Sequence, residues 1–271
     1  MKTRILIALA ILGLAATSVL ADQGQVMPWT IDGVPRQAIV CAPRVGTLNE
    51  KHPLIFAFHG HGGTMEGISQ TWNLYMTWPD AVVVYPQGLK SRGVVNDTDY
   101  DHPNNWGWQL WQGAYGDRDL KFYDRMLETM RQKFAIDDNR VYAVGFSNGA
   151  YFTYLLWAQR RTTLAAVGVV AGALWHEAPM PNVLTGPLPV MQIAGIKDPE
   201  VPLAWQAEAI EADQKINNAP MKQGQPCGDA CVLFPSSSQA PVKFRLHDGG
   251  HEYPSFASQE FVDFFKTQRR T

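Results

Sequence analysis

Several short segments of this chain are apolar along nearly their whole length, and most of them end in glycine or proline. Strands that are covered on both faces need apolar side chains on both sides, as in a parallel sheet between two layers of helices. We therefore predict strands in residues 53–60, 80–88, 139–147, 164–172, 188–195 and 242–250. Residues 37–43 alternate between apolar and polar side chains and predict one more strand.

The segments between these strands have the periodicity of amphipathic helices. In residues 116–136 the apolar side chains fall on one helical face, and Asp117 precedes them as an N-cap. That face holds Tyr123, Met126, Leu127, Met130 and Phe134. Residues 148–161 and 259–268 predict two more helices. This alternation predicts an α/β fold in which a mostly parallel central sheet carries helices on both faces.

The first 21 residues have the layout of a secretory signal peptide. Lys2 and Arg4 precede an apolar run that is too short to span a bilayer, and small residues follow it up to Ala21. We expect cleavage after Ala21, which leaves residues 22–271 as a single catalytic domain that is secreted or periplasmic. The alternative is an uncleaved anchor helix. No later stretch is long and apolar enough to cross a membrane, so we expect no membrane contact after cleavage.

The chain has three cysteines, and export would permit them to form disulfides. Cys227 and Cys231 flank a short glycine-containing turn that a disulfide could close, with buried free thiols as the alternative. Cys41 ends an apolar run and is predicted to be a thiol in the core. Two cysteines at this spacing, without a nearby histidine, make a poor zinc site.

Residues 143–151, AVGFSNGAY, match the G-x-S-x-G pattern of a serine nucleophile. The pattern stands where its chemistry needs it, between a predicted buried strand and a predicted helix. The turn is sharp, so Gly145 and Gly149 must be small, and it would expose the hydroxyl of Ser147 beside the amide of Asn148. The alternative is a glycine-rich turn in which the serine is incidental.

A nucleophilic serine needs a base and a carboxylate, which follow it along the chain in the order acid, then histidine. Asp198 lies in the loop after one predicted strand, and we favour it as the acid, with Glu200 as the alternative. His251 lies on a glycine loop after the last predicted strand and is the predicted base. His247 is nearer the end of that strand and is predicted to be structural, although the two histidines could exchange roles.

Residues 59–63, HGHGG, follow another predicted strand and resemble the glycine loops that supply oxyanion donors in esterases. We predict that the backbone amides of His61 and Asn148 form the oxyanion hole, and that His59 braces the loop. The rival interpretation is a metal site on His59 and His61. No further ligand pattern follows them, so we predict no metal.

Tryptophans gather in an irregular stretch just before the first predicted helix. Trp106, Trp108 and Trp111 lie there, and Trp175 follows a different predicted strand. Flat aromatic side chains suit a phenolic ester, the face of a sugar or a polyester chain, so we predict that these four bind substrate. The alternative is that they anchor their loops to the core.

These motifs together resemble the secreted esterases of the polyhydroxybutyrate depolymerase/feruloyl esterase family, close to carbohydrate esterase family 1. The likeness covers nearly the whole mature chain and is most specific in residues 137–150. It implies an α/β-hydrolase fold that uses Ser147, Asp198 and His251 without a cofactor. Two features depart from the family: the first predicted helix opens with GDRDLKF, and Tyr253 stands where a tryptophan usually precedes the proline.

We therefore predict a secreted serine esterase that acts through an acyl-serine intermediate on a feruloyl or acetyl ester of a polysaccharide or on a polyhydroxyalkanoate-type polyester. A serine peptidase of the same fold and a non-catalytic polymer-binding relative are the alternatives. The net charge of −2 gives no electrostatic footprint for nucleic acid. The expected partner is thus the ester substrate, a small molecule or the end of a polymer, with no nucleic acid and no obligate protein partner.

Overall fold

The computed structural model describes residues 24–46, 50–91, 105–174 and 183–270. In these residues a ten-stranded sheet has the order β1-β2-β4-β3-β7-β8-β9-β12-β11-β10. Its strands are β1 (Gln25–Ile31), β2 (Val34–Cys41), β3 (His52–Phe58), β4 (Val82–Pro86), β7 (Ile136–Phe146), β8 (Ala166–Val170), β9 (Val190–Gly195), β10 (Gln225–Pro226), β11 (Cys231–Phe234) and β12 (Val242–His247). The six strands from β4 to β12 are parallel, and the others join antiparallel at the two edges. A separate short ribbon pairs β5 (Leu89–Lys90) with β6 (Trp106–Gly107).

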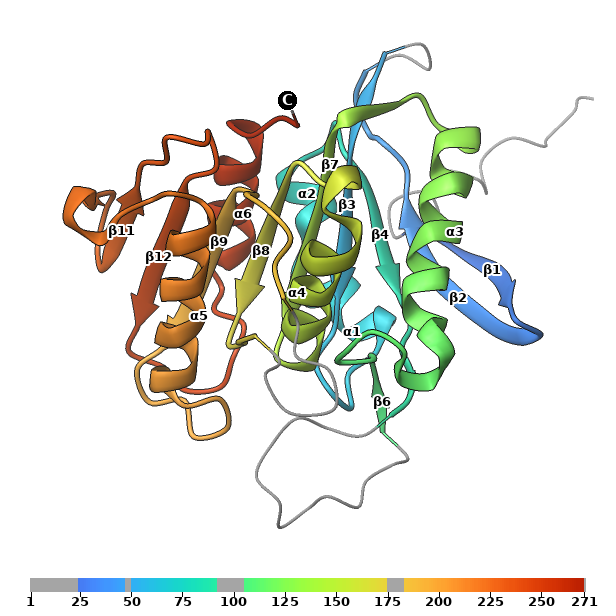
Figure 1. The fold of residues 1–271 in the computed structure, drawn as a ribbon. Helices are drawn as coiled ribbons and strands as arrows, with labels where there is room; N and C mark the ends of the chain where they lie inside the picture. The colour runs from blue at the N-terminus through green and yellow to red at the C-terminus, as the bar shows by residue number, and fades with distance from the viewer. Residues whose placement is uncertain (1–23, 47–49, 92–104, 175–182, 271) are drawn as a thin grey trace, which may run out of the picture.

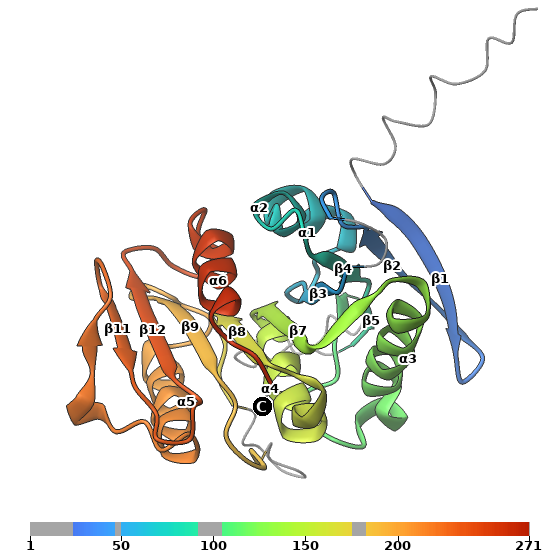
Figure 2. The same cartoon turned by 90° about the horizontal axis from the view of Figure 1, so that it is seen from above.

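Helices cover both faces of the central sheet (Figure 1). One layer consists of α3 (Arg118–Lys133), α4 (Asn148–Arg160) and α5 (Leu203–Ile216), and the other of α1 (Met65–Thr71), α2 (Leu74–Thr77) and α6 (Ala257–Lys266). Figure 2 shows the two layers on opposite sides of the strands, and each packs on its own cluster of buried apolar residues. Short 3₁₀ helices are η2 (Ala114–Asp117), η3 (Arg161–Thr163) and η4 (Met221–Gln223). The predicted α/β architecture is confirmed.

The predicted strands all correspond to strands of the sheet. The central strands β3, β4, β8 and β9 are buried along their whole length, as their apolar sequences require. Strand β12 is only half-buried beyond Val242, and it lies near the edge of the sheet, with only the short antiparallel strands β11 and β10 beyond it in the strand order. It is therefore less enclosed than the pattern of apolar runs predicted.

In α3, the first predicted helix, the predicted apolar face is buried, but Asp117 does not cap the helix with its side chain. Asp117 holds the N-cap position of α3, with a φ of 60°, but its side chain does not bond the first turn. Its carboxylate instead accepts from the amide of Gly113 and the side chain of Gln109. The carboxamide oxygen of Gln109 accepts from the amides of Asp119 and Leu120 and thus caps the helix in place of Asp117.

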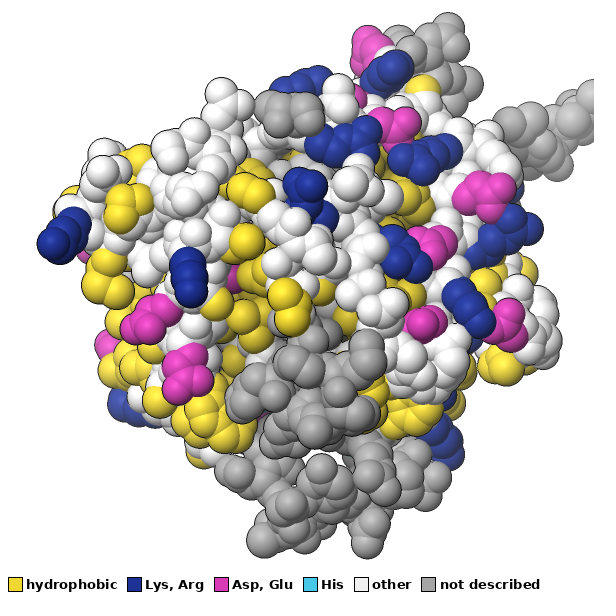
Figure 3. Space-filling model, in the orientation of Figure 1, with side chains coloured by type: hydrophobic (Ala, Val, Ile, Leu, Met, Phe, Trp, Pro, Cys, Tyr) yellow, Lys and Arg dark blue, Asp and Glu magenta, His cyan; other side chains and the backbone are white. Residues whose placement is uncertain are grey.

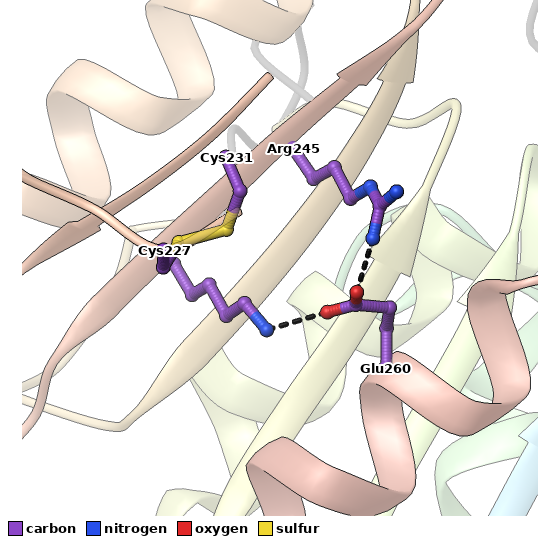
Figure 4. The surroundings of a disulfide bond; sticks show 5 residues. Cys227, Cys231, Arg245 and Glu260 are labelled. Atoms are coloured by element: carbon purple, nitrogen blue, oxygen red, sulfur yellow. Dashed lines mark hydrogen bonds and ion pairs between the residues drawn. A yellow bond between two sulfur atoms is a disulfide. The ribbon is translucent and has the colours of Figure 1, made fainter. Parts of the chain in front are cut away.

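The structure contains the predicted disulfide between Cys227 and Cys231, at the turn between β10 and β11 (Figure 4). Cys231 pairs across the ladder with Arg245 of β12, which forms an ion pair with Glu260 of α6. Cys41 is a buried free thiol, and burial raises the pKa of this thiol to about 12. The thiol stays protonated near neutral pH and is a poor nucleophile, as a thiol in the core would be.

The predicted signal peptide, residues 1–21, lies outside the described residues, so its cleavage stays a prediction. Within the residues that the structure does describe, no helix combines the length and the apolar character needed to cross a bilayer.

Candidate active site

Ser147 lies in the turn between β7 and α4, where the G-x-S-x-G pattern predicted a nucleophile. Its φ of 53° and ψ of −122° fall in a region that non-glycine residues rarely adopt. The amide of Ser147 donates to the carbonyl of Val170 at 2.9 Å, and its carbonyl accepts from the amides of Ala150 and Tyr151 in the first turn of α4. The sheet and the helix therefore hold the strained turn from both sides.

The glycines that flank the serine are required by close backbone approaches. A Cβ on Gly145 would lie 2.1 Å from the carbonyl oxygen of Gly149. A Cβ on Gly149 would in turn lie 2.2 Å from the carbonyl oxygen of Phe58, at the end of β3. Any side chain at either position would push α4 away from the sheet, so the spacing of the motif has a steric cause.

The structure brings Ser147, His251 and Asp198 together, although they are far apart in the sequence. Nε2 of His251 lies 2.8 Å from Oγ of Ser147, and Nδ1 lies 2.9 Å from Oδ2 of Asp198. An ionised carboxylate only accepts hydrogen bonds, so Nδ1 carries the proton and Nε2 is free to accept from the serine hydroxyl. The arrangement is that of a nucleophile, a base and an orienting acid.

The geometry separates the two candidate acids and the two candidate histidines. Glu200 is exposed, and its carboxylate lies 3.5 Å from Nε2 of His251, on the serine side of the ring rather than behind it. His247 accepts from the amide of Gly249 through Nδ1 and does not contact Ser147. Among the described residues, Asp198 and His251 are therefore the pair that aligns with the serine.

Asp198 is fixed by backbone donors in its own loop, a detail that the sequence did not reveal. Its Oδ1 accepts from the amides of Glu200 and Val201, both at 2.9 Å. The side chain of Gln206, from the first turns of α5, lies 3.4 Å from Oδ2 and donates to the carbonyl of Val201 at 2.8 Å. The carboxylate is thus held in the orientation that faces His251. A buried carboxylate needs such donors for its acceptor oxygens.

The loop of residues 59–63 lies directly beside the serine. A Cβ on Gly60 would come within 3.3 Å of the Cβ of Ser147. The amides of Gly62 and Gly63 are already bonded, to the carbonyls of Trp106 and Gly60. The amides of His61 and Asn148 have no backbone carbonyl as acceptor in the described part of the chain. These two amides therefore have no backbone acceptor among the described residues, and their role as oxyanion donors stays a prediction.

His59 braces this loop and is fully buried. Its Nδ1 lies 2.7 Å from the carbonyl of Gly60, and its Nε2 accepts from the amide of Gly88 at 3.0 Å and lies 3.1 Å from the side chain of Gln87. Burial lowers the pKa of His59 to about 4, with a further lowering from the neighbouring His61. A neutral imidazole with one donor and one acceptor fits this position, as the predicted structural role requires.

The tryptophans divide into different roles. Trp108 is buried, stacks on Phe152 and donates from its indole nitrogen to the carbonyl of His59, so it anchors the loop. The prediction that Trp108 binds substrate is therefore wrong, because the sequence does not show which indoles reach solvent. Trp106 is 38% exposed, and Trp111 is half-buried against the core. Trp175 lies outside the described residues.

The side chain of Asn148 is fixed by a contact with the tryptophan loop. Its Oδ1 accepts from the amide of Trp108 at 2.7 Å, and this contact ties the first turn of α4 to the tryptophan loop. His61 is fixed in a similar way, because its Nε2 lies 2.9 Å from the carbonyl of Ser91. Gly107 lies between the two side chains, and a Cβ on it would approach each of them to 2.9 Å.

Within the described ranges, no three histidine, cysteine, aspartate or glutamate side chains come together as they would to hold a metal ion. The side chains of His59 and His61 are each directed to backbone carbonyls. The metal interpretation of these two histidines therefore gains no support from their contacts. The absence of a cofactor stays a prediction.

A model of the phospholipase/carboxylesterase family matches residues 45–227, which is more than half of the chain. The chain belongs to the phospholipase/carboxylesterase family. A feruloyl esterase C from Emericella nidulans is 27% identical over 215 residues, which cover 75% of this chain and 72% of that protein. The predicted likeness to feruloyl esterases and to carbohydrate esterase family 1 is confirmed.

Solved structures extend the likeness of this phospholipase/carboxylesterase family member to the whole fold. An acetyl xylan esterase from Aspergillus awamori superimposes with a TM-score of 0.66 at 14% identity, over 90% of this chain and 99% of that one. A ferulic acid esterase of carbohydrate esterase family 1 from Anaeromyces mucronatus gives 0.61 at 15% identity, over 90% and 89%. At such identities the match shows the fold, and the predicted α/β-hydrolase fold is confirmed. Membership of the family confirms the coarser functional prediction, a hydrolase that acts on esters.

Proposed function

We propose that this protein is a serine esterase in which Ser147, His251 and Asp198 form the catalytic triad. The observation that supports the proposal most directly is the continuous chain of contacts from the serine hydroxyl through the imidazole to the buried carboxylate, at 2.8 and 2.9 Å. Distances of this length permit proton transfer without rearrangement. The strained backbone of the serine agrees with the elbow on which such nucleophiles stand.

In the proposed reaction, Oγ of Ser147 attacks the carbonyl carbon of the ester while its proton moves to Nε2 of His251. The electron pair of the carbonyl moves to its oxygen, and Asp198 stabilises the resulting imidazolium. As the tetrahedral species collapses, the bond from carbon to the alcohol oxygen breaks, and His251 gives its proton to that oxygen. A water molecule then repeats these steps on the acyl-serine and releases the acid.

We assign the oxyanion hole to the backbone amides of His61 and Asn148. Both amides lack a backbone acceptor within the described residues, and both belong to segments that contact Ser147 or adjoin it in the sequence. Such a donor is worth roughly 3 kcal/mol in the transition state. The bonds that fix His59, and those of the side chains of His61 and Asn148, would keep these amides in place without a conformational change during the reaction.

The proposed substrate is a carboxylic ester of a polysaccharide, with a feruloyl or acetyl group as the acyl part. The names of the similar proteins support this class, since they include a feruloyl esterase and an acetyl xylan esterase. On the face seen in Figure 3, which carries α3, α4 and α5, acidic and basic side chains lie among one another rather than in patches of one sign. A polyhydroxyalkanoate-type polyester is the second candidate. We further propose that the signal peptide directs the protein to the periplasm or the medium, where such polymers occur.

A covalent fluorophosphonate probe tests the nucleophile. We expect the probe to label the wild type and a control variant, Ser69→Ala on α1, but not Ser147→Ala. Ser69 is buried, and its hydroxyl donates to the carbonyl of Glu66 within α1 rather than to any residue of the triad, so its replacement leaves the site intact. Absence of labelling in the wild type would favour the non-catalytic polymer binder.

A panel of chromogenic esters with feruloyl, acetyl and 3-hydroxybutyryl groups then ranks the substrates. We expect turnover of the feruloyl or acetyl ester to exceed that of the 3-hydroxybutyryl ester. Good turnover of aminoacyl anilides together with inactivity on every ester would instead identify a peptidase.

A further inference from the structure

A cavity of about 610 Å³ lies beside the turn of the β1–β2 hairpin, outside the catalytic triad. Its lining contains two indoles, one basic and one acidic side chain, and several uncharged polar side chains. The residues on which the following argument depends are Trp29, Arg36, Gln37, Glu66, Gln87 and Trp106. Such a volume accommodates a ligand the size of one or a few sugar rings rather than a single solvent molecule.

The cavity and Ser147 lie at the same edge of the sheet. β1 runs antiparallel to β2, and β2 runs antiparallel to β4, so the turn after β1 lies at the carboxyl edge of the parallel strands. Gln37 of β2 and Ser147 after β7 are separated by three strand spacings in the order β2-β4-β3-β7. At ~4.8 Å for each spacing, the separation is about 14 Å, which a short polymer segment can span.

Direct contacts connect the cavity to the loop beside the serine. The carbonyl of Trp106, whose side chain lines the cavity, accepts from the amide of Gly62 at 2.7 Å. Gln87, another lining residue, lies 3.1 Å from Nε2 of His59. The loop that is proposed to hold the oxyanion therefore has Ser147 on one side and the cavity on the other.

The two charged side chains that line the cavity, Arg36 and Glu66, have opposite signs. Arg36 is buried, and its guanidinium is paired with the carboxylate of Asp119 at 2.8 Å and lies over the ring of Phe122. It therefore contributes structure rather than a free positive charge. The exposed polar groups at the rim are the amide of Gln37 and the carboxylate of Glu66.

The lining combines flat apolar rings with uncharged or hydrogen-bonding groups. A pyranose or furanose ring has one face of C–H bonds, which packs on an indole, and an edge of hydroxyls, which bonds to amide and carboxylate groups. A polyester chain has no hydroxyl groups along its length, so it has no donor to offer the carboxylate of Glu66. The chemistry of the cavity thus favours a saccharide.

We infer that this cavity is a binding subsite for a saccharide unit of the alcohol part of the substrate, about 14 Å from the ester that Ser147 cleaves. The inference rests on the proposed esterase function and narrows it, since it assigns the polymer to the glycans. The indoles of Trp29 and Trp106 hold the apolar faces of the sugar, and Gln37 and Glu66 bond its hydroxyls. Binding here presents the ester to the serine and raises kcat/KM for the polymer over that for a simple ester.

Binding of unesterified xylo-oligosaccharides to Ser147→Ala, measured by titration calorimetry, tests the subsite without catalysis. We expect binding that weakens tenfold or more when Trp29→Ala is added. Because Trp29 packs on Phe122 and bonds Thr129, that variant can lose its fold, so Glu66→Ala is the second variant. Loss of one hydrogen bond should weaken binding by roughly 3–10-fold. Glu208→Ala, an exposed change on α5, is the matched control and should bind like the parent.

The kinetic counterpart compares a feruloylated xylo-oligosaccharide with methyl ferulate. Glu66→Ala should lower kcat/KM for the oligosaccharide ester by the same factor by which it weakens oligosaccharide binding. It should change kcat/KM for methyl ferulate by less than twofold. If the wild type hydrolyses methyl ferulate but Ser147→Ala binds no oligosaccharide, the subsite is refuted and the esterase stands. If no ester is hydrolysed but the oligosaccharide binds with the expected dependence on Glu66, the esterase proposal fails instead. Competition by 3-hydroxybutyrate oligomers at this cavity would overturn the assignment to a saccharide.

Discussion

Acidification from pH 7 to pH 4.5 should destabilise the fold through His59, the residue that braces the loop beside the serine. Protonation would place a second N–H on the ring at Nε2, which now accepts from the amide of Gly88. Two donors would then face each other in a site without solvent, and the loop would have to open. His59 should therefore stay neutral in the folded protein until the pH approaches its lowered pKa of about 4.

The size of the effect follows from the difference between the folded and unfolded states. In the unfolded chain the imidazole takes up its proton near pH 6.5, whereas in the folded protein it does so only near pH 4. Between these values the unfolded state binds more protons, so the free energy of unfolding falls as the pH falls. At about 1.4 kcal/mol for each pKa unit, the loss is about 3 kcal/mol at its largest. Below pH 4 both states are protonated, and this contribution stops changing.

Urea unfolding of the wild type and of His59→Gln between pH 7 and pH 4.5 measures the effect. The other titrating groups act on both proteins, so the difference between the two pH dependences isolates His59. We expect the wild type to lose about 2–3 kcal/mol more than the variant over this range. An NMR titration of the His59 ring in the folded protein gives a direct check. A midpoint near 6.5, or equal pH dependences for the two proteins, would refute the reasoning.

Three further outcomes are expected. Gly149→Ala should lower kcat/KM by a factor of roughly a hundred or more. The added Cβ would lie 2.2 Å from the carbonyl oxygen of Phe58 and would move the first turn of α4. Activity close to that of the wild type would contradict this steric account. Burial alone would raise the pKa of Asp137, but its hydrogen bonds and the charges of two arginines lower it. Asp137→Asn should therefore reduce the free energy of unfolding at neutral pH, and this free energy should fall less steeply below about pH 4 than in the wild type, as measured by urea unfolding. Thiol titration in denaturant should find one reactive cysteine before reduction and three after it, because Cys227 and Cys231 are bonded; three reactive thiols in the unreduced protein would contradict the disulfide.

The parts of the site that could be predicted from the sequence are those with a local cause. Ser147 was recognisable because its turn demands glycines at fixed positions, and the structure shows the close backbone contacts behind that demand. Asp198 and His251 followed from chain order and from their places after predicted strands. The carboxyl ends of parallel strands meet at one edge, so such loops converge without any further information.

The parts that could not be predicted depend on which side of a loop faces the core. Trp106 and Trp108 are two residues apart in the same irregular stretch, but one is half-exposed and the other is buried against Phe152. Nothing in their composition separates them. Asp117 illustrates the same point, since a preferred capping residue stands at the N-cap while Gln109, from outside the helix, supplies the bonds. Side chains that come from elsewhere in the chain override the local preference.

Strand β1 and helix α5 were not predicted, because neither shows the apolar pattern by which the other elements were recognised. β1 contains Pro28 and is exposed along most of its length, as an edge strand can be, so it lacks an apolar run. Helix α5 buries the polar side chains of Gln206, Asp213 and Gln214 among its apolar ones. A helix whose inner face is polar does not show the apolar periodicity on which the prediction relied.

The same polar side chains explain why α5 supports the site. Burial raises the pKa of Asp213 well above its usual range. The hydroxyl of Tyr154 donates to Oδ2 of Asp213 at 2.8 Å and lies 3.0 Å from the amide oxygen of Gln192 of β9. Gln192 donates to the carbonyl of Gly172 and lies 3.4 Å from the carbonyl of Gln206, whose side chain fixes the Asp198 loop. These contacts form a bridge from the core of the sheet to the carboxylate behind His251, although one buried polar atom on each of Gln206, Asp213 and Gln214 has no hydrogen-bond partner in the described residues. The break in the apolar pattern of α5 is thus a mark of this support, because apolar residues at these positions could not hold the acid in place.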